Sequence, residues 1–264
     1  MDLGIANKVV LVAASSTGIG RAVAEGYARE RAKVIMCARN EGPLTEAADK
    51  IRQAIPGAEI ATLTVDLSSA ESIENLIFEG QKAIGGPIDI LVNNAGGPPE
   101  GGYFQLTDDD WWEGFQLNFM SMVMLCRNVV PGMKARQWGR IVNIGSVAAK
   151  QPIEGMLVSS AVRAGVLGFA KSIATEFAPY NITVNTVLPG YTQTPKLGEA
   201  LTEKAQFKKK TPQELLKEIE ESIPMGRLAK PSEIANMAVF LGSERAAYVT
   251  GQAIAVDGGF VKSV

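Results

Sequence analysis

Residues 8–20 read KVVLVAASSTGIG, and this stretch decides the fold. The run 9–12 is short and apolar at every position, which is typical of a strand buried on both faces. The small residues that follow end the strand, and residues 21–32 have the composition of a helix. A strand, a glycine turn and a helix start direct free backbone N–H groups toward one point, which attracts phosphate. The alternative is a tight turn that binds no ligand.

The same alternation of strand and helix continues along the chain. Apolar runs predict further strands at 33–37, 59–65, 88–92, 140–144, 182–188 and 252–256. Helical patterns occur at about 44–55, 69–84, 107–133 (where a break is suspected), 155–178 and 231–241. Such alternation produces a parallel sheet with helices on both faces. We therefore expect residues 1–264 to form a single α/β domain, a Rossmann-type doubly wound sheet of seven parallel strands. The long polar stretch 191–227, with an amphipathic segment at 212–223, suggests a lid-like insertion over the site.

Composition narrows the range of functions. A net charge of −2 gives no footprint for nucleic acid. The N-terminus does not resemble a signal peptide, and we expect no membrane span. The chain has no histidine, which excludes His-based triads and the usual zinc sites, so no metal site is expected. Cys37 and Cys126 lie far apart and fit core thiols in a reduced, cytoplasmic protein.

Polar and glycine-rich residues follow most of the predicted strands. They stand at 15–20, 38–39, 66, 93–96, 146 and 189–194. The carboxyl ends of parallel strands share one edge of the sheet, and ligands bind there, at the point where the strand order reverses. The sequence therefore predicts a single ligand site at this edge.

These residues make the chain resemble the classical short-chain dehydrogenase/reductase family over nearly its whole length. The resemblance rests on motifs in the right order: Gly18-Ile19-Gly20, Asp66-Leu67, Asn93-Asn94-Ala95-Gly96, Asn118, Ser146, Pro189-Gly190 with Thr192 and Thr194, and Asp257-Gly258-Gly259. Residues 224–259 look especially similar to bacterial 3-oxoacyl carrier-protein reductases. The resemblance implies a nicotinamide dinucleotide and a small-molecule substrate.

The cofactor residues that the resemblance implies are mostly present. The family's glycine motif begins with Thr-Gly, where this chain has Ala13 and Ala14. By resemblance, Asp66 would accept a hydrogen bond from the adenine amino group, although it could merely cap a helix. The cofactor-binding candidates are Ser15, Ser16, Gly18, Ile19, Gly20, Arg39, Asp66, Leu67, Asn94, Ala95, Gly96, Arg163, Pro189, Gly190, Thr192 and Thr194.

The turn at 37–40 favours NADP(H) over NAD(H). A carboxylate at this point would bind the ribose 2′-hydroxyl of NAD and repel a 2′-phosphate. The turn has no carboxylate, and Arg39 can pair with the phosphate. The alternative is that Arg39 is a solvated surface residue.

The catalytic half departs from the family pattern. The resemblance places a serine after the fifth strand, then a tyrosine, then a lysine one helical turn later. Ser146 and Asn118 match the pattern, but Ser159 and Arg163 stand where tyrosine and lysine are expected. A serine hydroxyl is far less acidic than a phenol, and arginine is too basic to carry protons at neutral pH. Residues from loops could supply an acid instead; the candidates are Glu154, Tyr191 and Tyr103.

Two functions remain open at this point. The first is an NADP(H)-dependent oxidoreductase acting on a carbonyl or hydroxyl substrate with a modified site. The second is an NADP(H)-binding protein without ordinary turnover that serves as a sensor, scaffold or partner subunit. In either case the broad apolar surfaces of 107–133 and 155–178 predict a homo-oligomer, and the family's use of the C-terminal segment 252–264 favours a tetramer over a dimer.

Overall fold

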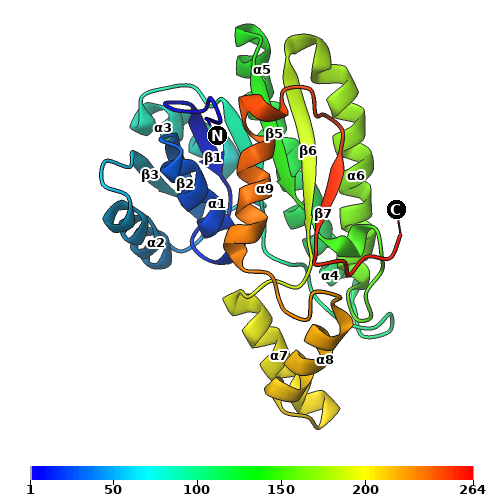
Figure 1. The fold of residues 1–264 in the computed structure, drawn as a ribbon. Helices are drawn as coiled ribbons and strands as arrows, with labels where there is room; N and C mark the ends of the chain where they lie inside the picture. Colours follow the sequence, from blue (N-terminus) through cyan, green and yellow to red (C-terminus); the bar gives the residue numbers. More distant parts are fainter. Residues whose placement is uncertain (1, 264) are drawn as a thin grey trace.

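The structure, a computed structural model, describes residues 2–263, with the side chain of Phe207 excepted; Val264, at the end of the predicted C-terminal interface, lies outside the described residues. A parallel sheet in the order β3-β2-β1-β4-β5-β6-β7 forms its centre (Figure 1). The strands are β1 (Val9–Val12), β2 (Lys33–Ala38), β3 (Ile60–Thr64), β4 (Ile90–Asn93), β5 (Gly139–Ile144), β6 (Ile182–Pro189) and β7 (Ala253–Val256). The predicted doubly wound, seven-stranded sheet is confirmed.

The strand order reverses at β1, which pairs with β2 on one side and with β4 on the other. Chain connections therefore leave in opposite directions from the carboxyl ends of β1 and β4. In sheets of this kind the crevice between such strands receives the ligand. The topology thus selects one edge of the sheet for the site.

Helices cover both faces of the sheet (Figure 1). One layer contains α1 (Gly18–Arg29), α2 (Glu41–Ala54) and α9 (Pro231–Leu241); the other contains α3 (Ala70–Ile84), α4 (Asp108–Phe115), α5 (Ser121–Arg136) and α6 (Leu157–Phe177). Alternate residues of β1 enter the two cores: Val10 and Val12 pack with α1 and α9, whereas Val9 and Leu11 pack with α3 and α5. Alternation along a strand buried on both faces accounts for its uninterrupted apolar sequence.

The stretch Leu157–Tyr180 is long and apolar enough to cross a membrane by length and composition. In the structure it packs along β6, with Val158, Val166 and Ala170 buried. Only 39% of its apolar window is buried, so packing against the sheet covers one side of this helix and leaves apolar residues on the other.

Two local predictions need correction, and a third becomes specific. Helix α1 begins at Gly18 rather than at residue 21, because the turn glycines form its first turn. The break expected within 107–133 is a π-helix, Gln116–Met120, between α4 and α5. The stretch 191–227 contains not one helix but two, α7 (Pro195–Lys208) and α8 (Pro212–Ser222), which project beyond the carboxyl ends of the strands (Figure 1).

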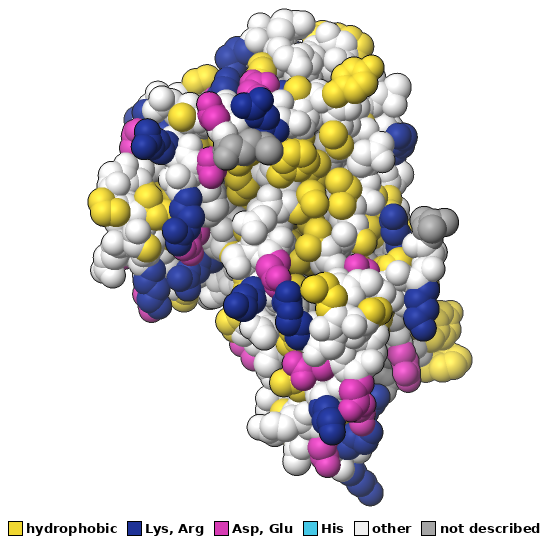
Figure 2. Space-filling model, in the orientation of Figure 1, with side chains coloured by type: hydrophobic (Ala, Val, Ile, Leu, Met, Phe, Trp, Pro, Cys, Tyr) yellow, Lys and Arg dark blue, Asp and Glu magenta, His cyan; other side chains and the backbone are white. Residues whose placement is uncertain are grey.

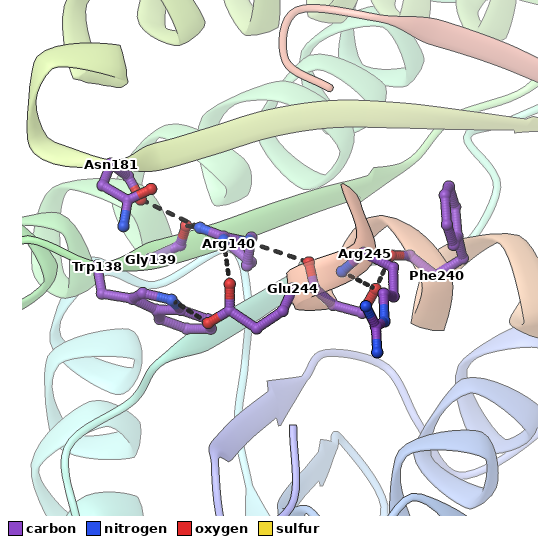
Figure 3. Close-up of polar contacts among 8 residues, drawn as sticks. Trp138, Gly139, Arg140, Asn181, Phe240, Glu244 and Arg245 are labelled. Atoms are coloured by element: carbon purple, nitrogen blue, oxygen red, sulfur yellow. Dashed lines mark hydrogen bonds and ion pairs between the residues drawn. The ribbon is translucent and has the colours of Figure 1, made fainter. Parts of the chain in front are cut away.

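A buried cation joins the opposite end of the sheet to the C-terminal region. Arg140 of β5 is completely buried, and its guanidinium donates to the Glu244 carboxylate at 3.2 Å and to the Asn181 carbonyl at 3.1 Å. The Trp138 indole N–H donates to the same carboxylate at 2.7 Å (Figure 3). Burial lowers the pKa of Arg140, and Glu244 opposes this. A buried charge needs such a partner, so this network fixes β5 against the segment that precedes β7.

Both cysteines are free and buried. Cys37 lies in β2 and Cys126 in α5, within the core layer shared with α3. Burial raises the pKa of each thiol to about 12. At neutral pH both therefore stay protonated, and a protonated thiol is a poor nucleophile.

Candidate active site

The turn from β1 into α1 presents an uncapped helix end. Thr17 occupies the N-cap position, yet its side chain makes no capping hydrogen bond, and the first turn of α1 has no acidic residue. The first N–H groups of α1 therefore lack the side-chain partner that usually satisfies one of them. Free N–H groups at the positive end of a helix fit a phosphate group of a dinucleotide.

Ala14 lies in the left-handed backbone region, with φ +46°. An L-residue with a β-carbon is strained there, and glycine is favoured. The Asn94 side chain, at the end of β4, donates to the carbonyls of Ala13 at 3.2 Å and Ala14 at 3.1 Å. A β-carbon at Gly20 would lie 2.3 Å from the Ala14 oxygen, so only glycine fits there. Asn94 and Gly20 thus hold the turn in shape.

The polar candidates near the ends of β2 and β3 have different surroundings. Ser15 is buried, and its hydroxyl accepts a hydrogen bond from the Cys37 N–H at 3.0 Å. It therefore connects the turn after β1 to β2. Asp66 accepts from the Ser68 hydroxyl and N–H, which lowers its pKa, and nearby Arg39 lowers it further. Ser69, rather than Asp66, caps α3. Arg39 and Asp66 are therefore neighbours at the predicted adenosine end.

A cavity of about 220 Å³ lies at the carboxyl ends of the central strands. Its lining brings together ten of the predicted residues: Ile19, Asn94, Ala95, Ser146, Ser159, Arg163, Pro189, Gly190, Thr192 and Thr194. Two further predicted residues lie next to lining residues: Gly96 follows Ala95 in the chain, and Asn118 accepts a hydrogen bond from Arg163. The cavity lining does not include Ser15, Ser16, Gly18, Gly20, Arg39, Asp66 or Leu67; Ser16 and Gly18 line a separate groove, and Leu67 is in the core.

Arg163 is anchored at the floor of the site. Its guanidinium donates to the Ile144 carbonyl at 3.0 Å and to the Asn118 side-chain oxygen at 2.9 Å. Only 6% of Arg163 is exposed, and burial lowers its pKa to about 10, so the guanidinium stays charged at neutral pH. Asn118 sits in the π-helix, a distortion that is frequent at functional sites.

Two buried donors of this pair lack acceptors. The Nε of Arg163 and the Nδ2 of Asn118 have no hydrogen-bond partner among the described residues. Leaving a buried donor unpaired costs free energy, about 1–3 kcal/mol for each group. The Arg163–Asn118 pair thus places two unsatisfied buried donors next to the cavity that Arg163 lines.

Two serine hydroxyls line the cavity. Ser146 follows β5, and its oxygen accepts from the Ala148 N–H at 3.1 Å, which leaves the hydroxyl proton free to donate. Ser159 lies on α6 one turn before Arg163 and is 6% exposed. Both hydroxyls can hydrogen-bond a substrate oxygen.

Of the loop residues considered as an acid, only Tyr191 lines this cavity. Burial raises its pKa, which makes it a weaker acid. Glu154 lines a neighbouring groove, and Tyr103 is 71% exposed and lines neither. None of the three is therefore an evident proton donor.

Lys196 is a cavity residue that the sequence reasoning missed. It is the second residue of α7, lines the cavity, and donates to the Gly97 carbonyl at 2.8 Å. A signal for α7 was available, because Thr194 followed by Pro195 is a typical helix start.

Comparison with known proteins agrees with this geometry. Residues 13–261 match the family described as "Enoyl-(Acyl carrier protein) reductase". The chain is 36% identical over 259 residues to 3-oxoacyl-(acyl-carrier-protein) reductase FabG of Aquifex aeolicus, covering 98% of this chain and 99% of that protein.

The fold and sequence of this chain are also similar to those of solved structures. L-sorbose reductase of Gluconobacter frateurii, complexed with NADPH and L-sorbose, has a TM-score of 0.93 at 36% identity, covering both chains fully. An NADPH-bound short-chain oxidoreductase of Pseudomonas aeruginosa, described as containing an atypical catalytic center, has a TM-score of 0.89 at 33% identity and covers 99% of each chain. With matches of this extent in sequence and structure, the chain belongs to the classical short-chain dehydrogenase/reductase family of enzymes.

Proposed function

We propose that the protein is an NADP(H)-dependent oxidoreductase that interconverts a small carbonyl compound and its alcohol through a modified acid–base site. The observation that carries this proposal is the cavity in which Arg163, Ser146 and Ser159 face the carboxyl ends of β4 to β6. NADPH in the related sorbose reductase and Pseudomonas oxidoreductase supports the choice of cofactor.

The residues present fit a dinucleotide. The uncapped start of α1 suits the phosphates, and the charged guanidinium of Arg163 belongs to a residue that lines the cavity at the strand ends. Thr192 and Thr194 lie at the cavity wall, where they would hold the nicotinamide end. When bound, the reduced nicotinamide supplies a hydride. Ser146 then orients the substrate oxygen through its free hydroxyl proton.

The modification concerns proton transfer. We propose that Ser159 and Arg163 occupy the positions of the family's tyrosine and lysine. A phenol titrates near pH 10, and a neighbouring cation lowers that pKa. A serine hydroxyl is not acidic enough to donate a proton in the same way. Arg163 is held by Asn118 and by the end of β5, so it supplies positive charge and position rather than a proton.

The test restores the family's pair. Ser159→Tyr with Arg163→Lys should raise NADPH-dependent reduction of acetoacetyl-coenzyme A or diacetyl by roughly 10–100-fold, part of what general acid catalysis contributes. Stopped-flow or steady-state loss of NADPH absorbance measures the rate. The single variant Ser159→Tyr is the control, because Arg163 still crowds the ring.

The result could also contradict the proposal. If neither the native protein nor the double variant reduces any probe while both bind NADPH, the function without ordinary turnover is correct. Rapid native turnover that the double variant lowers would instead show that Ser159 and Arg163 themselves belong to an efficient native site.

We also propose a homotetramer in the cytoplasm. An aromatic row crosses α4, the π-helix and α6: Trp112, Phe115, Phe119 and Phe169, with neighbouring ring centroids 5.1–6.3 Å apart. Trp112 is 69% exposed. A second apolar patch covers β6 and β7 beside α9 (Figure 2). Two such surfaces on different sides of the molecule fit an assembly with two kinds of interface.

A further inference from the structure

The cavity lacks an evident group that could protonate the reduced carbonyl. Three of its lining residues ionise besides Arg163: Glu100, Tyr191 and Lys196. Glu100 is already engaged in an ion pair with Lys204 at 2.7 Å. Burial makes the Tyr191 phenol less acidic than usual. Lys196 therefore stands out.

Lys196 has an unusual position for a cation. It is the second residue of α7, a helix of 14 residues, where the positive end of the helix dipole disfavours an ammonium group. A lysine that served only as a solvated surface charge would be better placed near the other end of the helix. The position raises the energy of the charged form and so favours proton release.

The Lys196 ammonium is held by a backbone carbonyl of another residue that lines the cavity. It donates to the Gly97 carbonyl at 2.8 Å, and a β-carbon at Gly97 would lie 2.6 Å from Nζ, so the glycine makes this approach possible. One donor is used by Gly97, and an ammonium has three. In the described part of the chain Lys196 forms no ion pair, which leaves the remaining donors for a ligand.

Charged groups around Lys196 raise and lower its pKa. Burial lowers its pKa first; Arg163 on α6 and Arg39 after β2 lower it further, while Glu100 and Glu199 raise it. The net shift is downward. A general acid is most effective when its pKa approaches the working pH, and a shift from the ordinary lysine value near 10.4 moves in that direction.

We propose that Lys196 is the catalytic acid of this site, in the place of the missing tyrosine. The inference rests on the proposed function and on NADPH as hydride source. Hydride addition forms a C–H bond at the carbonyl carbon, and the π electron pair of the C=O bond moves to oxygen. That oxygen takes a proton from Nζ, so an O–H bond forms as an N–H bond breaks. The neutral amine is recharged by water.

Two substitutions distinguish proton donation by Lys196 from its positive charge. Lys196→Met removes the proton donor and the charge, whereas Lys196→Arg keeps a cation and a hydrogen-bond donor that does not release its proton at neutral pH. Both should lower kcat for reduction of acetoacetyl-coenzyme A or diacetyl by roughly 10²-fold, the lower range for general acid catalysis. Lys208→Met, at an exposed lysine on the same helix, should not change kcat.

The native pH profile supplies a second readout. Because the acid must be protonated, activity should fall as pH rises through the pKa of Lys196, and this limb should disappear in Lys196→Arg. NADPH affinity, measured by fluorescence titration, should stay within about threefold of native in Lys196→Arg if the arginine preserves the local charge.

A direct titration needs no turnover. After reductive ¹³C-methylation, the dimethyl-lysine resonance missing from Lys196→Arg identifies Lys196, and its midpoint should lie below those of the other lysines. A midpoint equal to theirs, or full kcat in Lys196→Met, would overturn this role. Absence of any NADPH-dependent reduction by native protein would contradict the proposed function, and this role with it.

Discussion

At the scale of single residues, the site contains one alanine in a backbone conformation that suits glycine. Ala14 has φ +46°, and its carbonyl is fixed by Asn94. The sequence placed Ala14 at the family's glycine position, but the strain follows only from the backbone. We infer that the turn keeps its shape because Asn94 and the buried strand before it outweigh the local cost.

Replacing Ala14 by glycine should therefore stabilise the protein. Ala14→Gly removes a left-handed alanine, worth about 1–2 kcal/mol, and loses part of this gain through the extra freedom of the unfolded chain. We expect a net gain of about 0.5–1 kcal/mol in the free energy of unfolding, measured by urea denaturation. Ala13→Gly is the matched control: Ala13 is buried without positive φ and should lose stability. A loss of stability in Ala14→Gly would show that its methyl group packs usefully.

Arg39 tests the choice of cofactor. Arg39 directly follows β2, and its positive charge lies close enough to Asp66 to lower the pKa of that carboxyl. Arg39→Ala should weaken NADPH binding by roughly 10–100-fold, the range for a charge-assisted hydrogen bond, and leave NADH binding unchanged. Calorimetric titration checks both, with exposed Arg127→Ala as the control. Equal native affinity for the two cofactors would count against a preference for NADP(H).

At the scale of elements, the sequence was sufficient for strands and helices buried in the two core layers. Helix α9 was predicted with its observed bounds, 231–241, since Pro231 and Glu233 mark its start. The π-helix was only suspected as a break, because it depends on packing around Asn118 rather than on local preference. Helix α7 was missed, because its buried residues, Leu201 and Ala205, pack mainly on α8.

Much of the cavity could likewise be predicted, because strand ends meet at one edge of the sheet. Ser146, Ser159, Arg163 and Thr192 were named by their match to the family's motifs, and they line one cavity. The Arg163–Asn118 contact could not be predicted, since it joins residues 45 positions apart. The same holds for Lys196, whose place depends on the path of a segment with little core of its own.

The start of α9 gives a pH-dependent prediction. Glu233 accepts from both terminal nitrogens of Arg227 and from the Lys230 N–H, contacts that lower its pKa to about 2. A carboxylate whose pKa is lowered by folding stabilises the native state above the unfolded value, near 4.3, and this contribution disappears as pH falls toward 2.

Glu233→Gln should therefore lower Tm at pH 7, and the difference from native should shrink as the pH falls below about 4. Differential scanning fluorimetry across pH measures it. Glu71→Gln changes an acidic residue in the first turn of α3 that forms no ion pair with an arginine within residues 2–263, and should have a smaller effect. A difference that stays constant down to pH 2 would assign the effect to helix capping alone.

At the scale of the whole molecule, the proposed tetramer is the feature most open to direct measurement. The chain has a mass of 28.1 kDa. Light scattering at micromolar concentration should give about four times this mass. Phe169→Asp should lower the measured mass, because a carboxylate in the aromatic row would weaken the contact between subunits that we propose for this row. A native mass of one chain would contradict the proposal.

The two buried thiols also allow local opening of the core to be measured. Cys37 and Cys126 sit in different elements on one side of the sheet, and neither can be alkylated while that core stays closed. Their labelling rates therefore count how often each neighbourhood opens, independently of any substrate. Equal rates at the two positions would mean that strand β2 and helix α5 come apart as one cooperative unit, whereas unequal rates would show which of them opens first.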